Sequence, residues 1–386
     1  MSNSNLTNAK RAKNDEFYTQ FNDIEAEMTA YYEYNHEVFR NKIILMPCDD
    51  PEWSNFVRFF ATNFKRYGIK ALISTSYAES GTNDKLTDIE KNSPYYDAKK
   101  HKTHGKLFVM TGDMNGDGKI DSDDVSFQKY LEGDGDFRSE EVTKLRDEAD
   151  IIVTNPPFSL FREFLNWIMG GEKQFIILGN KNAINNKDVF PLIQNNKVWL
   201  GTSSPKEFNT PNGTTKKVSG LTRWFTNLDH GMRHEKLILD TMANNLRFNK
   251  RLRKKLTSYG DVKHYPKYDN YNAIEVPFMQ CIPSDYDGIM GVPVTFFDKY
   301  NPEQFEVIGA SQRHCHDRMV ETRQYDSYHE YNSAGEKLKS NGSKTNGNPN
   351  LLGKPERGHY FMNDEGRTVY SLYTRIFVKL KHPKKD

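Results

Sequence analysis

The four residues Asn155-Pro156-Pro157-Phe158 carry the groups with which this chain could do chemistry. Each proline fixes φ at about −65° and lacks an N–H, and the residue before a proline avoids the helical region, so these residues should form a stiff, extended corner. Asn155 offers a side-chain carbonyl, and Pro156 offers a backbone carbonyl that Pro157 holds still. Two such acceptors on the N–H bonds of an exocyclic amine would draw its nitrogen toward tetrahedral geometry and free its lone pair for attack.

Phe158 would complete such a site by offering a flat face on which a base can stack. In duplex DNA the amine of a base can be reached only when its nucleotide is flipped out of the helix. The alternative interpretation is structural, with two prolines that terminate a strand and a phenylalanine that packs in the core. The apolar run 150–154 before the corner and the helical pattern 159–169 after it favour the catalytic interpretation, because open α/β sheets bind their ligands at the carboxyl ends of strands.

Apolar runs of strand length alternate with helical patterns in the first half of the chain. We expect strands at 42–47, 69–77, 106–110, 150–154 and 173–180, and helices at 14–38, 53–67, 139–149 and 159–169. Ser139 is a typical N-cap for the helix that follows it. This alternation predicts an α/β fold with a Rossmann-like, doubly wound and mostly parallel sheet. Later in the chain, the pattern predicts a mobile loop at 331–350 and a hairpin that turns at 363–366.

The composition fits a chain long enough for two domains or for one large domain with an appendage. It has 386 residues, a mean hydropathy of −0.82, and three cysteines without the spacing of a disulfide framework or a CxxC motif, namely Cys48, Cys281 and Cys315. No apolar run approaches the roughly 18 residues that span a bilayer. Residues 1–15 are polar and lack the apolar core of a secretory signal. We therefore expect a cytoplasmic protein that is not bound to a membrane.

Charge is unevenly distributed along the chain. Residues 1–200 carry 25 basic and 31 acidic side chains, whereas residues 201–386 carry 29 basic and 21 acidic ones. The densest basic stretch is NKRLRKK at 249–255. Such an asymmetry indicates that the second half meets a polyanion, although a solvated helix face would give the same local pattern.

Residues 113–124, DMNGDGKIDSDD, match the ligand spacing of a calcium-binding loop. Its six ligand positions would be filled by Asp113, Asn115, Asp117, the carbonyl of Lys119, Asp121 and Asp124, with Gly118 at the sharp turn. We expect a helix at 123–131 after this loop. Calcium binding and an acidic surface turn are both open interpretations. The histidine-rich run 313–318 has no second pair of ligands nearby, so we assign it no metal.

The corner and its surroundings resemble a known family. Thr-Asn-Pro-Pro-Phe resembles the catalytic motif of amino-methyltransferases that use S-adenosylmethionine, and its asparagine resembles the adenine branch. Further segments resemble the EcoRI-type adenine-specific DNA methyltransferases, namely 13–25, 46–56, 131–141, 155–164, 175–184, 223–230 and 291–309. The similarity covers most of residues 13–310 and the terminal segment 372–379.

The resemblance implies transfer of a methyl group from S-adenosylmethionine to the 6-amino group of a flipped-out adenine in duplex DNA. The sequence itself predicts a flexible arm at 1–12 and an insertion at 79–130. The resemblance implies a cofactor-binding catalytic domain at 13–200, which includes this insertion, and a target-recognition region at 201–386. It favours a monomer and is compatible with a cognate restriction endonuclease as a functional partner. Two alternatives stay open: methylation of guanine amines in RNA or of a glutamine amide in a protein, and a non-catalytic, calcium-dependent binding protein on the same fold.

The resemblance also implies roles for particular residues. Asn155, Pro156, Pro157 and Phe158 would be catalytic, and the cofactor would be contacted by Phe17, Thr19, Cys48, Asp49, Asp50, Ser54, Asp136, Phe137 and Asn155. The segment 47–56 lacks the glycine-rich loop that usually follows the first strand, so its pocket must be built differently. The second strand also lacks the acid that usually binds the cofactor ribose, and its substitute is not evident. Asp136 would accept a hydrogen bond from the cofactor adenine, or it is simply a turn residue.

Overall fold

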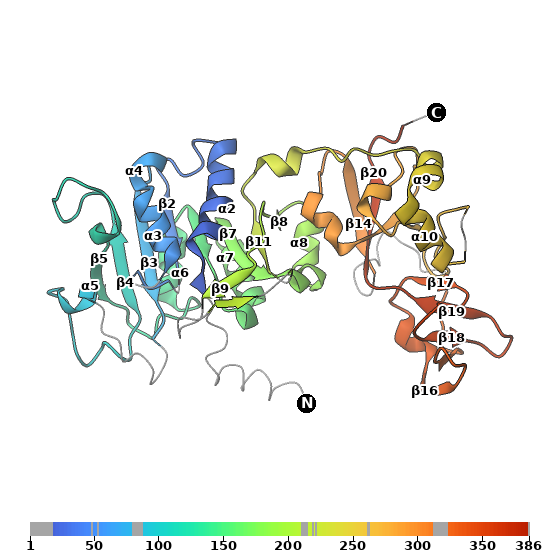
Figure 1. Cartoon of the computed structure of the whole chain (residues 1–386). Helices are drawn as coiled ribbons and strands as arrows, with labels where there is room; N and C mark the ends of the chain where they lie inside the picture. The colour runs from blue at the N-terminus through green and yellow to red at the C-terminus, as the bar shows by residue number, and fades with distance from the viewer. Residues whose placement is uncertain are drawn as a thin grey trace. The chain divides into compact units, whose positions relative to one another are not determined.

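The computed structural model describes residues 18–47, 49–51, 54–78, 88–209, 215–217, 220, 222–260, 263–311 and 323–384. The chain forms two compact units (Figure 1). Unit 1 comprises Met1–Ile184 and Val198–Gly231, and unit 2 comprises Asn185–Lys197 and Met232–Asp386. No helix in the described part of the chain is both long and apolar enough to cross a membrane.

Unit 1 contains an eight-stranded sheet with the strand order β5-β4-β3-β2-β6-β7-β11-β8. Its four central strands are parallel and comprise β3 (Ala71–Ser76), β2 (Ile43–Met46), β6 (Ile151–Thr154) and β7 (Gln174–Asn180). Antiparallel strands extend both edges, namely β4 (Lys106–Met110), β5 (Ser126–Tyr130), β11 (Thr222–Thr226) and β8 (Trp199–Leu200). The predicted α/β fold is confirmed, and its parallel part is the centre of the sheet.

Helices cover both faces of this sheet because alternate strand residues point to opposite sides. The face that bears Ile44, Ile151 and Ile176 packs in one core with α2 (Phe21–Tyr34), α3 (Asn55–Thr62) and α4 (Phe64–Tyr67). On the other face, Phe161 of α7 (Phe161–Gly170) contacts Phe225, with 4.9 Å between ring centroids. Unit 1 also contains α5 (Asp88–Lys91), α6 (Glu140–Glu148) and a small sheet of β1 (Tyr18–Thr19), β9 (Glu207–Asn209) and β10 (Thr215–Lys217).

Most of the predicted elements of unit 1 are present. Ser139 caps α6 as predicted, because its hydroxyl accepts a hydrogen bond from the backbone N–H of Val142. The helix predicted at 123–131 is wrong: a short 3₁₀ turn at Ser122–Asp124 leads into strand β5. Val125 and Phe127 are buried, and β5 pairs with β4. The strand therefore satisfies its backbone through β4, which a local sequence pattern does not reveal.

The boundary between the units differs from the predicted position at residue 200. Residues 201–231 group with unit 1, because β11 lies between β7 and β8 in the large sheet. Similarly, β4 and β5 of the segment 79–130, which we expected to be an insertion, extend that sheet.

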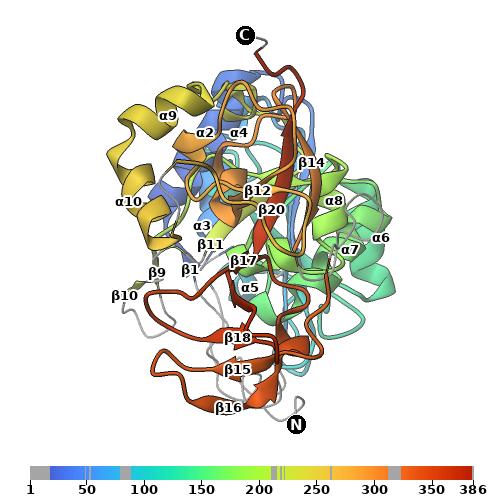
Figure 2. The same ribbon diagram turned by 90° about the vertical axis from the view of Figure 1, so that its right-hand side faces the viewer.

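Unit 2 is built from two antiparallel-rich sheets and short helices (Figure 2). The four-stranded sheet has the order β12-β13-β20-β14, and the five-stranded sheet has the order β16-β15-β18-β19-β17. Their bounds are β12 (Ile274–Glu275), β13 (Met290–Pro293), β14 (Phe305–Ala310), β15 (His329–Tyr331), β16 (Lys337–Asn341), β17 (Asn350–Leu352), β18 (Tyr360–Met362), β19 (Thr368–Ser371) and β20 (Arg375–Leu380). The helices are α8 (Phe190–Gln194), α9 (Met242–Phe248) and α10 (Lys250–Ser258).

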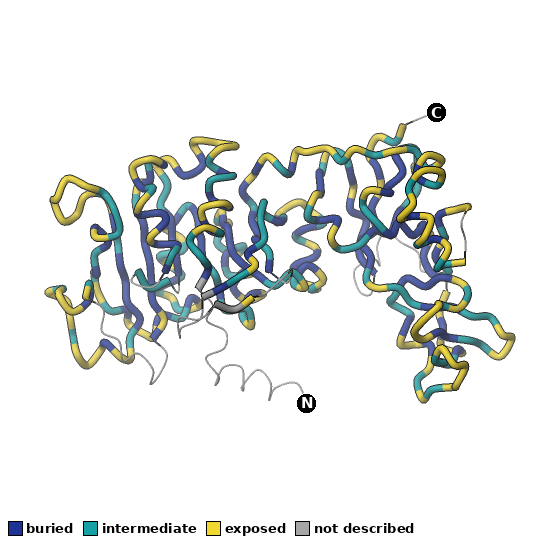
Figure 3. The backbone as a smooth tube through the Cα atoms, in the orientation of Figure 1, coloured by how far each residue is buried: buried dark blue, intermediate teal, exposed yellow. Residues whose placement is uncertain are grey.

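The segment 331–350, predicted to be a mobile loop, is instead folded. It contains β16 and a 3₁₀ turn at Gly342–Thr345. A Cβ atom at Gly342 would lie only 2.0 Å from the carbonyl oxygen of Tyr325, so this turn packs directly against the chain. The hairpin predicted around 363–366 is confirmed by the antiparallel pairing of β18 with β19. Figure 3 shows that buried residues lie along the strands within each unit.

In the sequence, helix α8 is separated from the rest of unit 2 by Val198–Gly231, which belongs to unit 1. Its segment Asn185–Lys197 lies between β7 and β8 in the chain but belongs to unit 2. Gln194 donates a hydrogen bond to the carbonyl of Ile308 in β14 (2.7 Å), and Phe190 contacts Phe297 with 6.5 Å between ring centroids.

Candidate active site

The Asn-Pro-Pro-Phe corner lies where the fold of unit 1 is best suited to bind a ligand. Within the sheet, β3 is the neighbour of β2 on one side, and β6 is its neighbour on the other side. Asn155 directly follows β6, so it lies at the carboxyl edge of this topological switch point. Its Oδ1 atom is buried. After Pro157, a 3₁₀ turn at Phe158–Leu160 leads into α7, with Leu160 N–H donating to the Pro157 carbonyl at 2.9 Å.

A partly buried aspartate, Asp49, joins the corner to the loop after β2. Thr154 Oγ1 lies 2.6 Å from Asp49 Oδ2 and 2.9 Å from the carbonyl oxygen of Pro47. Ser54 donates a hydrogen bond to Asp49 Oδ1 at 2.7 Å and caps α3 by accepting from the N–H groups of Phe56 and Val57. The residue before Asn155 is therefore tied to the segment that replaces a glycine-rich loop.

Burial raises the pKa of Asp49 to about 7, the hydrogen bonds from Thr154 and Ser54 oppose this shift, and the nearby charge of Asp50 adds to it. The hydrogen-bond pattern agrees with a protonated side chain. The single proton of the Thr154 hydroxyl can be donated to only one of its two neighbouring acceptors. If Asp49 is protonated and donates to Thr154, the Thr154 hydroxyl is free to donate to the Pro47 carbonyl, and all three groups are paired.

Three of the predicted cofactor contacts gather at this edge of the sheet. Thr19 is buried, and its carbonyl accepts a hydrogen bond from Asn55 Nδ2 at 2.8 Å, beside Ser54 at the start of α3. Asp50 lies in the same loop, where its carbonyl accepts from the Ser54 N–H at 2.8 Å. Asp49, by contrast, directs its carboxyl group toward Ser54 and Thr154. The predicted contacts Phe17 and Cys48 lie outside the described residues.

The segment Gly133–Phe137 lies against the end of β3. Gly135 has φ +86°, and a Cβ atom there would lie 2.3 Å from the carbonyl oxygen of Ser76, so only glycine fits. The N–H of Ala78 donates to the Asp134 carbonyl at 2.7 Å. The predicted adenine-binding segment is therefore placed at the carboxyl edge of the sheet, one strand away from β2.

Asp136 and Phe137 make contacts that the sequence did not reveal. Asp136 forms a two-point ion pair with Arg138, with 2.6 Å between Oδ2 and Nη2, and these contacts raise the pKa of Arg138. Phe137 is buried against Phe164 and Trp167 of α7, with ring centroids 4.9 Å and 5.6 Å apart. The segment is thus anchored on α7, the helix that follows the Asn-Pro-Pro-Phe corner.

Two buried hydroxyl groups at this edge suit a bound polar ligand. Among the described residues, Thr19 Oγ1 and Ser76 Oγ have no hydrogen-bond partner. An unsatisfied buried hydroxyl is costly unless a ligand pairs with it. Ser76 was not predicted because the family resemblance implies an acid at the end of the second strand, whereas a hydroxyl there can also pair with a ribose. These two hydroxyls fit a cofactor that carries amino-acid and nucleoside groups.

The structure gives no support to the predicted calcium site. Among the described residues, no three His, Cys, Asp or Glu side chains are grouped so that they could hold a metal ion. The loop is instead closed by its own backbone, with Asp113 accepting from Gly116 (2.7 Å) and Gly118 (2.9 Å), and Asp124 accepting from Met114 (2.7 Å). The acidic-turn interpretation accounts for these contacts. The run 313–318 lies outside the described residues.

Comparisons with known proteins agree with this site. The family model described as adenine-specific methyltransferase EcoRI matches residues 5–381. The chain belongs to this family. The type II methyltransferase M.EcoRI of Escherichia coli is 41% identical over 323 residues, which cover 79% of this chain and 89% of that protein. M.MgeORF184P of Mycoplasma genitalium is 34% identical over 319 residues, 78% of this chain and 84% of that protein.

A third relative, the type II methyltransferase M.MpnI of Mycoplasma pneumoniae, is 32% identical over 319 residues, 78% of this chain and 83% of that protein. No solved structure matches the chain. Because the family model spans both units, the resemblance found in the short motifs is confirmed across the molecule, and the enzyme is an adenine-specific methyltransferase.

Proposed function

We propose that the corner 155–158 transfers a methyl group from S-adenosylmethionine to the 6-amino group of an adenine flipped out of duplex DNA. The enzyme is a site-specific DNA methyltransferase of the adenine-specific class, and its family implies S-adenosylmethionine as the donor. The observation that supports the residue assignment is the position of Asn155, on a proline-stiffened corner at the switch point of the sheet.

In this proposal the protein works by positioning and by hydrogen bonding. Asn155 Oδ1 and the Pro156 carbonyl accept the two N–H groups of the adenine amine, which directs the nitrogen lone pair toward the donor. Phe158 provides the stacking face. The cofactor supplies an activated methyl group when it is bound. Transfer would form the N–C bond as the bond between the methyl group and the donor sulfur breaks, with the electron pair of that bond left on sulfur. The amine would then carry the positive charge and would lose one of the protons held by these two oxygens to solvent.

We assign the cofactor site to the carboxyl edges of β2 and β3. Thr19, Asp50 and Ser54 lie at the methionine end, and Ser76 takes the place of the missing ribose acid, since its hydroxyl is buried beside Gly135. Asp136 and Phe137 lie at the adenine end. Asp49 supports the site through Thr154 rather than by direct contact. Phe17 and Cys48 keep the contact roles that the resemblance implies.

We assign target recognition to unit 2, which carries 27 basic and 20 acidic side chains. A net positive charge favours a DNA partner because cations that neutralise phosphates release counterions. Calcium is not part of this proposal, because positioning by the corner requires no metal ion. A monomer, a cytoplasmic location and a cognate restriction endonuclease stay predictions.

The decisive experiment supplies tritiated S-adenosylmethionine to the enzyme with duplex DNA, RNA and protein in parallel. We expect label only in DNA, recovered as N6-methyladenine at a defined sequence in long-read sequencing. Label in RNA or in protein glutamine would replace the proposed substrate by one of the alternatives. Cofactor binding without transfer to any substrate would support the non-catalytic alternative.

A further inference from the structure

The surface of unit 2 has a strong concentration of positive charge on α10. Five of the nine residues of this helix are basic, none is acidic, and its buried positions are Leu252 and Leu256. The basic residues are Lys250, Arg251, Arg253, Lys254 and Lys255. The helix is therefore held to unit 2 by two leucines, while most of its cations are exposed.

These cations have no acidic partners in the described part of unit 2. None of the ion pairs among the described residues includes any of the five. Two of them lie over aromatic rings instead, with Arg251 3.9 Å from the centroid of Phe278 and Lys255 4.6 Å from that of Tyr259. Such contacts hold the side chains in place without neutralising them. The charge is therefore available to an external anion.

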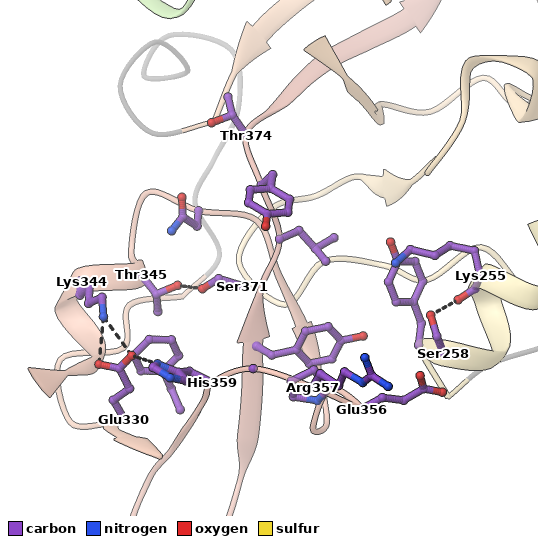
Figure 4. A pocket seen from close by; sticks show the side chains of 18 residues that line it. Lys255, Ser258, Glu330, Lys344, Thr345, Glu356, Arg357, His359, Ser371 and Thr374 are labelled. Atoms are coloured by element: carbon purple, nitrogen blue, oxygen red, sulfur yellow. Dashed lines mark hydrogen bonds and ion pairs between the residues drawn. The ribbon is translucent and has the colours of Figure 1, made fainter. Parts of the chain in front are cut away.

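A cavity of about 650 Å³ adjoins the carboxyl-terminal end of α10 (Figure 4). Lys255 and Ser258 line one side of it, and the five-stranded sheet of unit 2 lines the other. Arg357 enters from the segment between β17 and β18. Tyr373, which is 90% exposed, lies at the rim after β19.

The charges inside the cavity leave two cations for a ligand. Glu330 is neutralised within the protein, because Lys344 Nζ lies 2.9 Å and His359 Nδ1 lies 2.7 Å from its Oε1. These contacts hold the pKa of Glu330 below its usual value in spite of its burial. Glu356 is exposed beside Arg357. Lys255 and Arg357 are the cations that remain for an incoming phosphate, since the Ser258 hydroxyl donates its proton to the Lys255 carbonyl at 2.7 Å.

We propose that α10 and this cavity form the face of unit 2 that holds the sugar-phosphate backbone of DNA, with one phosphodiester bound between Lys255 and Arg357. The inference rests on the proposed function and names the surface by which the enzyme binds its substrate outside the flipped base. With a rise of about 1.5 Å per residue, the helix extends about 7.5 Å from Lys250 to Lys255, along which a duplex presents about four phosphates. Tyr373 packs its exposed ring against the adjoining sugar or base.

Two groups of variants test this surface separately. The first is Lys250→Gln, Arg253→Gln and Lys254→Gln on the exposed side of α10, and the second is Lys255→Gln with Arg357→Gln in the cavity. The matched control is Lys337→Gln with Lys339→Gln, which removes two exposed charges from β16 outside the cavity. Binding of a cognate duplex is measured over a range of salt concentrations, together with S-adenosylmethionine binding and kcat at saturating DNA.

The logarithm of the DNA association constant falls linearly with the logarithm of the salt concentration. We expect each lost phosphate contact to make this slope less steep by about 0.9. The cavity pair should bind DNA about tenfold more weakly than the native enzyme, with the magnitude of the slope reduced by about one because one phosphate is lost, and the helix triple should lose more. Cofactor affinity, kcat and the control pair should be unchanged. Native DNA affinity and an unchanged slope in both variant groups would overturn the inference. Failure of the proposed function would appear differently, as a native enzyme that does not methylate DNA.

Discussion

The two units of the molecule differ in the sign of their net charge and in how far their functional polar groups are exposed. Unit 1 carries 27 basic and 32 acidic side chains and buries the hydroxyl residues Thr19, Ser54, Ser76 and Thr154 of its candidate site. Unit 2 carries 27 basic and 20 acidic side chains and exposes most of the cations of α10. A buried site gives precise positions for bond formation, whereas exposed cations give a salt-dependent hold on a polyanion. The comparison predicts that changes in unit 1 alter the methyl-transfer step and that changes in unit 2 alter DNA affinity.

The largest expected effect on the methyl-transfer step is at Asn155 in the Asn-Pro-Pro-Phe corner of unit 1. Asn155→Ala should lower kcat about 100- to 1,000-fold, because it removes one of the two acceptors on the target amine. Binding of S-adenosylmethionine and of DNA should be retained. Methylation kinetics together with calorimetric binding of the cofactor measure both quantities. Asn92→Ala, at an exposed position of unit 1, is the matched control. Native activity in the Asn155 variant would remove the assigned role.

The next largest effect concerns Asp49 and pH. Its pKa is raised from 3.8 to about 7 by burial, so the folded protein binds a proton that the unfolded chain releases. The stability that this proton contributes is complete below about pH 4 and is lost as pH rises toward 7, by about 2–4 kcal/mol. Asp49→Asn should flatten this part of the curve of unfolding free energy against pH. Asp123→Asn, which changes an exposed acid, should leave the curve as it is in the native enzyme.

A smaller effect is expected at Ser76, where one substitution should change protein stability and cofactor affinity in opposite directions. Ser76→Ala removes a buried hydroxyl that has no partner among the described residues, so thermal stability should stay level or rise. If the hydroxyl pairs with the cofactor, the same change should weaken S-adenosylmethionine binding about three- to tenfold. Thermal unfolding and calorimetry on one preparation give both results. Equal cofactor affinity in Ser76→Ala and in the exposed-site control Ser333→Ala would exclude the assigned contact.

A separate effect, on stability alone, concerns the acidic loop of unit 1. Asp124 is buried, and although burial raises its pKa, hydrogen bonds from the N–H groups of Asp121, Asn115 and Met114 hold it below the usual value. Asp124→Ala should therefore lower the free energy of unfolding by about 2 kcal/mol near neutral pH. In the native protein, this contribution is lost as pH falls through the lowered pKa. A thermal scan of Asp124→Ala against Asp123→Ala measures the difference.

Calcium can be tested in the same loop. The backbone contacts of Asp113 and Asp124 close the loop without a metal ion, so we expect a calcium titration to release no heat and to leave Tm unchanged. A clear binding isotherm and a rise in Tm would instead support the calcium interpretation.

The sequence predicted unit 1 better than unit 2, and the reason is physical. Strands such as Ile43–Met46 and Ile151–Thr154 are buried on both faces, so they appear as continuous apolar runs. The strands of the five-stranded sheet have three to five residues and gain their order from distant partners. Asn350, for example, is held by Asn270 and Thr345, which a local pattern cannot show. The low-complexity segment 331–350 was therefore mistaken for a loop.

The candidate site was predicted in part. The corner and its place after a strand followed from proline chemistry and the apolar run before it. The inward direction of the Asp49 carboxyl did not, because its partner Thr154 is 105 residues away in sequence. Ser76 was missed because its burial and lack of a partner are properties of the folded chain. Residue type can therefore indicate the chemistry, while the contacts that hold each group require the fold.

The path of the chain through α8 limits how sequence specificity could be exchanged between relatives. Unit 2 is assembled from two separate stretches, since Asn185–Lys197 joins it from within the sequence of unit 1. A transplant of residues 232–386 alone would leave β14 without the hydrogen bond from Gln194 and Phe297 without Phe190. Under the proposal that unit 2 recognises the target, a chimaera that is meant to inherit a new target sequence must carry the thirteen-residue piece Asn185–Lys197 as well, with two additional splice points.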